Sequence, residues 1–186
     1  MEWDALLTDL ESRFDAERRA EIAAASADLA EAELAGIRIL DRLRNAVGAE
    51  LHVRTLSGVA VDGRLLRAGE EVLVIDEGEG LRTLVPVRAI AVVSPLPGPA
   101  PAADPARSGA GGPGLAAALR TLARQGARVR LLLAAGEVVG RLSRVGADHV
   151  DVLVDGVNPA SRLEPVRPRR GRTSVLLAAV EAVRSR

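Results

Sequence analysis

The feature that most limits what this chain can fold into is an internal repeat. Residues 51–75, LHVRTLSGVAVDGRLLRAGEEVLVI, recur with little change as residues 129–153, VRLLLAAGEVVGRLSRVGADHVDVL. The glycines keep their places, because Gly48, Gly58, Gly63 and Gly69 match Gly126, Gly136, Gly140 and Gly146. A closing segment, residues 85–93, recurs as residues 175–183. A repeat of this kind indicates one small structural unit present twice, so we expect two small domains rather than one large one.

The periodicity of each copy is that of short strands. From Leu51 the apolar residues alternate with polar ones, and glycines separate the runs, which predicts strands joined by turns. In the second copy we expect strands at residues 128–133, 138–144, 149–155 and 174–183, the last holding a turn. We therefore predict a mainly β protein with helices (α+β), in which two five-stranded small barrels cover residues 48–94 and 115–186.

The segments around the barrels differ in composition. Residues 1–47 have helical spacing, and residues 95–114 hold six prolines and five glycines, which predicts a flexible linker. The second domain is expected to begin with a short helix, residues 115–125, stopped by Gly126. It also carries a basic insertion, residues 157–172, that the first copy lacks.

The N-terminal helix offers a candidate protein-interaction surface. Its apolar stripe is formed by Trp3, Leu7, Leu10 and Phe14. A second stripe is expected from Leu29, Ile39, Leu40 and Leu43. Exposed apolar side chains of this kind are expected to be buried against another surface. We favour packing on the chain's own barrels or in a dimer interface over binding of an external partner.

Charge and composition restrict the function classes. Cysteine and lysine are absent, and all 25 basic residues are arginine, which we attribute to a GC-rich genome. Residues 1–50 carry six arginines against twelve acidic residues, while residues 157–186 carry seven against two, so the chain is acidic at one end and basic at the other. With neither a membrane-length apolar run nor a secretory signal, we expect a cytoplasmic protein without membrane contact.

The order of elements resembles a known family. The segments VAVDGRLLRAGEEVLVID and LVPVRAIAVV, with Gly58 and Gly63, are similar to the Sm-like family of SH3-type small barrels, which includes the bacterial RNA chaperone Hfq. The resemblance covers roughly residues 37–94 and 115–184 and implies that these glycines let the strands bend. The family's Tyr-Lys-His RNA-binding cluster is not matched, because Val85, Pro86 and Val87 stand there. The chain also resembles uncharacterised proteins of GC-rich bacteria that begin with a Trp-Asp-x-Leu helix, here starting at Trp3, and are often labelled regulators.

Motifs of catalysis are not found, so we expect no enzyme, no cofactor, no bound metal and no small-molecule substrate. The two histidines, His52 and His149, occupy non-equivalent positions without metal-ligand spacing. Asp148, Asp151 and Asp155 could gather a cation, but Asp151 and Asp155 alternate with valines and are expected on the solvent face of a strand.

Two functions remain. The first is an interaction or scaffolding module whose partner is the chain itself or another protein. The second is nucleic-acid binding through the insertion, by Arg162, Arg167, Arg169, Arg170 and Arg172, aided by Arg128, Arg130, Arg184 and Arg186. These arginines could equally be a solvated loop. We favour the interaction module, because neutral net charge and a barrel sequence without aromatic residues disfavour nucleic-acid binding.

Overall fold

The computed structural model describes residues 2–96, 98, 113–154 and 171–186, and for residues 2–12 and 33 only the backbone is described. It separates into two compact units, Met1–Arg38 and Ile39–Arg186. In the first unit, helix α1 runs over Glu2–Gly36 and ends at this glycine. Phe14 and Leu29 are 68% and 67% exposed, because a single helix cannot bury its own side chains.

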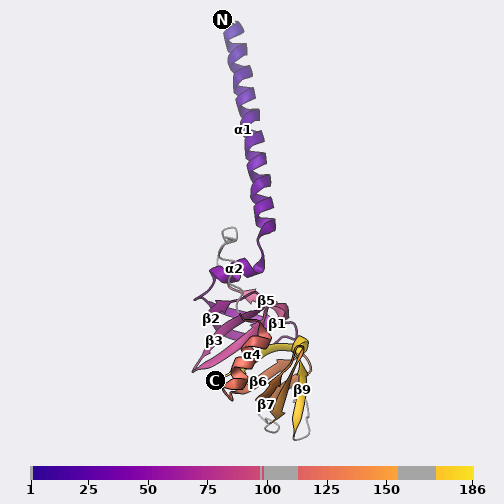
Figure 1. Ribbon diagram of the computed structural model, residues 1–186. Coiled ribbons are helices and arrows are strands. Elements are labelled where there is room, and N and C mark those ends of the chain that lie inside the picture. Colours follow the sequence, from indigo (N-terminus) through magenta and orange to yellow (C-terminus); the bar gives the residue numbers. More distant parts are fainter. Residues whose placement is uncertain (1, 97, 99–112, 155–170) are drawn as a thin grey trace. The chain divides into compact units, whose positions relative to one another are not determined.

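The second unit is mainly β with a few helices (Figure 1). Its first half holds β1 (Glu50–Thr55), β2 (Ala60–Ala68), β3 (Val72–Gly78), β4 (Leu81–Pro86) and β5 (Ile90–Ser94). Its second half holds β6 (Arg128–Leu133), β7 (Gly136–Val145), β8 (His149–Val154), β9 (Arg172–Leu176) and β10 (Val180–Ser185). In each half a 3₁₀ turn precedes the last strand, η1 (Val87–Ala89) and η2 (Leu177–Ala179).

The strands form one antiparallel sheet in the order β5-β1-β2-β3-β4-β10-β6-β7-β8-β9. The two halves therefore have the same internal order and are joined where β4 pairs with β10. The irregularities repeat as well. The β2–β3 register shifts between Leu65 and Arg67, and the β7–β8 register shifts at the matching Leu142 and Arg144. The two copies thus share register as well as sequence.

Two short helices cover the sheet. Helix α2 (Ile39–Asn45) buries Leu40 and Leu43 in the first half, whereas Ile39 is 48% exposed. Of the expected second stripe, then, only these two leucines enter the core. Helix α4 (Leu115–Arg124) packs on β7 and buries Leu119 completely. It is followed by Gly126, which has a φ of 63° and so adopts the left-handed conformation that ends helices.

Each half has its own hydrophobic core, but neither core is complete without the other half. The core of the first half takes in Leu132 and Ala182 from the second, which are 2% and 0% exposed. The core of the second half takes in Val72 from the first, which is 5% exposed. Burial of these side chains helps to hold the two halves together in one compact unit.

One glycine in each half is required by close packing of strands. A Cβ placed on Gly63 would lie 2.1 Å from the carbonyl oxygen of Asp76, and one on Gly140 would lie 2.1 Å from that of Leu153. Both distances are far below van der Waals contact. The match between these glycines in the sequence therefore has a common cause, which is the approach of the second strand of each half to the third.

Candidate interaction surfaces

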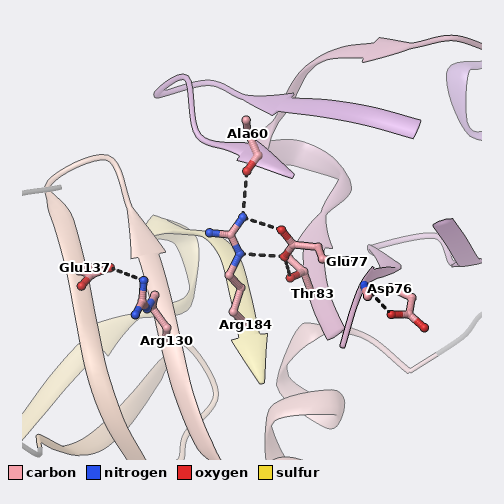
Figure 2. A network of polar contacts seen from close by, with 8 residues as sticks. Ala60, Asp76, Glu77, Thr83, Arg130, Glu137 and Arg184 are labelled. Atoms are coloured by element: carbon pink, nitrogen blue, oxygen red, sulfur yellow. Dashed lines mark hydrogen bonds and ion pairs between the residues drawn. The ribbon is translucent and has the colours of Figure 1, made fainter. Parts of the chain in front are cut away.

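The junction between the halves is held by a polar clamp as well as by strand pairing. Arg184 on β10 donates from Nε and Nη2 to the two carboxylate oxygens of Glu77, both at 2.8 Å, and from Nη2 to the carbonyl oxygen of Ala60 at 2.9 Å (Figure 2). Both charged side chains are largely buried, with 23% and 12% of their surfaces exposed. A two-pronged arginine–carboxylate pair of this kind fixes orientation as well as adding energy.

A second clamp lies around Glu181, which is only 7% exposed. Its Oε2 accepts hydrogen bonds from the hydroxyl of Thr55, at 2.6 Å, and from the backbone N–H and hydroxyl of Ser57. Because Thr55 and Ser57 belong to the first half and Glu181 to the second, this buried carboxylate ties the two copies together. A buried charge is tolerated here because hydrogen bonds surround it.

The residues that form the two clamps are not repeated at the equivalent positions of the other copy. By the matching registers of β5 and β10, the first-half counterparts of Arg184 and Glu181 are Ser94 and Ala91. Val154 stands in the second half where Glu77 stands in the first. The repeat has therefore diverged at the residues that join its two copies, and the clamps belong to this one junction.

A cavity of about 510 Å³ lies beside the junction. It is lined by Arg128, Arg130, Arg184 and Arg186, together with Leu81, Val129, Val139 and Ser185. Arg130 forms an ion pair at 3.6 Å with Glu137, which is 3% exposed and whose Oε1 has no hydrogen-bond partner among the described residues (Figure 2). The structure thus brings together the four arginines that the sequence assigned an auxiliary role in nucleic-acid binding.

The structure describes the other candidate residues only in part. Trp3, Leu7 and Leu10 belong to α1, but their side chains lie outside the described set. Of the five arginines in the insertion, only Arg172 is described, and it is exposed at the start of β9. The positions of Arg162, Arg167, Arg169 and Arg170 lie outside the described residues.

The aspartates expected on a solvent face need a correction. Asp151 is only 8% exposed, and its Oδ1 accepts a hydrogen bond from the hydroxyl of Ser174 at 2.6 Å. It is therefore a buried strand residue, and Asp155 lies outside the described residues. A hydrogen bond from His149 is the main reason why the pKa of Asp148 is lowered below its usual value. Among the described residues, no group of three or more His, Asp or Glu could hold a metal ion.

Sequence reasoning missed the residues of the junction. Glu77, Glu181 and Thr55 carry no motif. The bonded pairs Glu77–Arg184 and Thr55–Glu181 are 107 and 126 positions apart in the sequence, and they meet because β4 pairs with β10. The available signal was the divergence of Arg184 from Ser94 and of Glu181 from Ala91 within an otherwise matching segment.

The comparisons with known proteins add no relative. No protein-family model matches the chain, and no curated protein matches it. Within the described part of the chain, none of the helices combines the length and the apolar character needed to cross a bilayer.

Proposed function

We propose that this protein is a non-enzymatic interaction or scaffolding module built from two Sm-like barrels fused into one unit. The strand order, the repeated register shifts and the paired glycines Gly63 and Gly140 support the two-barrel assignment. The clamps around Arg184 and Glu181 support a fixed pair rather than two independent domains. Such a unit presents surfaces to partners instead of enclosing a reaction centre.

The observation that carries this proposal is the pair of open sheet edges. Strands β5 and β9 stand at the ends of the sheet, and each has a single neighbouring strand within the described residues. Val92 on β5 is 51% exposed and Leu176 on β9 is 61% exposed. An unpaired strand offers main-chain hydrogen bonds to an added strand, and its apolar side chains give that contact stability.

The test is the molar mass in solution, measured by light scattering over a range of concentrations. We expect the full chain to self-associate. We expect the double variant Val92→Lys, Leu176→Lys to shift toward monomer, because lysines on an edge strand disfavour pairing with a further strand. The matched control is Leu66→Lys, since Leu66 is 38% exposed on β2 in the interior of the sheet. A wild-type chain that stays monomeric, with thermal stability unchanged by deletion of residues 1–35, would contradict the proposal.

The second candidate is a nucleic-acid-binding regulator that uses the arginine-rich insertion. Its support is the exposed position of Arg172 beside β8 and the cavity lined by four other arginines. If all five insertion arginines contact phosphates, the slope of log affinity against log salt approaches about −3.5 for single strands, from roughly −0.7 per contact. Gel-shift series with and without residues 157–172 separate the two candidates, because the interaction module needs no nucleic acid.

A further inference from the structure

A second cavity, of about 290 Å³, lies where turns of the two halves meet at the junction. From the first half its lining takes Leu56 and the η1 residues Arg88 and Ala89. The second half contributes the turn before β7, around Ala134, and η2 together with Glu181. Because both halves line this cavity, it exists only while the junction between them is closed.

Short side chains give this cavity its space. Five of its nine lining residues are alanines, and Leu56 and Leu133 add apolar surface. Its volume is close to the lower end of the range of about 300–1,000 Å³ that is typical of ligand pockets, so it suits a small molecule. We call it the alanine cavity, after Ala89, Ala134, Ala135, Ala178 and Ala179.

Two side chains of opposite charge line the alanine cavity. Glu181 belongs to β10 and is 7% exposed, whereas Arg88 belongs to η1 and is exposed. Within the described part of the chain, no ion pair joins these two side chains, although they line one small space. A carboxylate and a guanidinium group therefore both face the cavity without binding each other.

Hydrogen bonds hold both charged groups in place. The three hydrogen bonds that Glu181 accepts, from Thr55 and Ser57, all end on Oε2. Their donors are neutral, so they stabilise the buried carboxylate without cancelling its charge. Arg88 donates from Nη2 to the carbonyl oxygen of Leu177, which uses one of the five N–H donors of its guanidinium group. Both groups are thus pre-organised beside an apolar space, which lowers the cost of binding a ligand there.

We propose that the alanine cavity binds a free α-amino acid with an apolar side chain. Such a molecule carries an ammonium group, a carboxylate group and one apolar group on a single carbon, and these match the three kinds of lining. The ammonium group donates to Glu181, the carboxylate accepts from the guanidinium group of Arg88, and the side chain packs on the alanines. This inference concerns a small ligand and goes beyond the proposed interaction with a protein.

Other classes of ligand meet only part of this lining. A simple cation is attracted by Glu181 but repelled by Arg88, and for a simple anion the two effects are reversed. An internal peptide segment carries neither terminal charge, and each end of a peptide carries one of the two. A free amino acid brings both charges at once.

The ligand should stabilise the fold, because it contacts Arg88 in the first half and Glu181 in the second. The test is isothermal titration calorimetry and thermal melts of the full-length chain with L-leucine as the probe. At a concentration of about 100 times the Kd, the Tm should rise by roughly 5–11 °C for a unit of about 150 residues.

Three related compounds test each part of the site separately. N-acetyl-leucine lacks the ammonium charge, leucine amide lacks the carboxylate charge, and glycine lacks the apolar side chain. Each should bind at least about tenfold more weakly than L-leucine, because each loses a charge-assisted hydrogen bond or the burial of an apolar group.

Two conservative variants assign the charges. Glu181→Gln keeps an oxygen acceptor for Thr55 and Ser57 but removes the charge, so it should abolish the preference for L-leucine over N-acetyl-leucine. Arg88→Met keeps a side chain of similar length and should abolish the preference for L-leucine over leucine amide. These ratios separate a role in binding from a role in stability alone, and circular dichroism checks that each variant is folded.

A third variant tests the cavity without touching its charged groups. Ala134→Leu fills the space and should weaken binding of L-leucine at least about tenfold. Leu56 stands at the matching turn position of the first half, so the turn accepts a leucine. The matched control is Ala91→Leu, which is exposed on β5 outside the cavity and should bind L-leucine like the wild type.

Three results would overturn the inference: no heat and no Tm shift with L-leucine at millimolar concentrations, equal binding of L-leucine and its two charge-neutralised derivatives, or full binding by Ala134→Leu. If L-leucine fails to bind while light scattering still shows association through β5 and β9, the alanine cavity assignment fails and the interaction module stands. Binding of L-leucine by a chain that stays monomeric would instead keep the site and remove the interaction module.

Discussion

Removing the Arg184 side chain should destabilise the whole second unit, although the residue lies one position from Ser185, where β10 ends. Arg184→Ala deletes two hydrogen bonds to the Glu77 carboxylate, which is 12% exposed in the intact pair and keeps the hydrogen bond from the Thr83 hydroxyl. Breaking a fully buried pair costs about 3–5 kcal/mol and a surface pair about 0–1 kcal/mol. With both side chains largely but not fully buried, we expect a loss of about 2–3 kcal/mol in the free energy of unfolding.

The assay is urea denaturation, supported by thermal melts in which this loss should lower the Tm by roughly 4–12 °C for a unit of about 150 residues. Arg184→Ala, Glu77→Ala and the double variant form a double-mutant cycle, with an expected coupling energy of about 1–2 kcal/mol. The control is Arg64→Ala, whose partner Glu50 lies at 3.4 Å with both side chains more than 60% exposed, and which should cost under about 1 kcal/mol. If Arg184→Ala costs no more than Arg64→Ala, the clamp does not hold the halves together.

Further variants test the rest of the fold. Gly63→Ala and Gly140→Ala should each cost about 2–3 kcal/mol in urea denaturation, because the new Cβ would lie 2.1 Å from a carbonyl oxygen; a cost near zero for either would show that the strands can separate freely. Leu119→Ala should cost about 2–5 kcal/mol because this leucine of α4 is fully buried, whereas Leu66→Ala at a 38% exposed site should stay near zero in the same assay. Glu181→Ala leaves the hydroxyls of Thr55 and Ser57 without their acceptor and should lower the Tm through a loss of about 1–3 kcal/mol; an unchanged melt would mean that solvent replaces the carboxylate.

The strands could be predicted from the sequence because their signals are local. Alternation of apolar residues placed a strand at residues 128–133, which is β6, and predicted a turn within residues 174–183, which is η2. The end of the helix before Gly126 was also predicted from a local signal, the glycine itself. The structure confirms it, because Gly126 follows α4 with a positive φ. The repeat then transferred each local pattern from one copy to the other.

The joint between the copies could not be predicted in the same way. Pairing of β4 with β10 joins residues about 100 positions apart, and no periodicity specifies which edge of one half meets which edge of the other. The burial of Asp151 was missed for a related reason, because alternation gives the face of a strand but not what covers that face, here Ser174 on β9.

The most direct test of the account is whether the two halves unfold together. Native-state hydrogen exchange in increasing denaturant reports the opening free energy of individual amides in the first half, on β2 and β3, and in the second half, on β7 and β8. Because Leu132 and Ala182 complete the core of the first half and Val72 that of the second, we predict that the most protected amides of both halves converge on one free energy. Two plateaus separated by more than about 1 kcal/mol would contradict the account, because they would show that each copy folds as an independent domain.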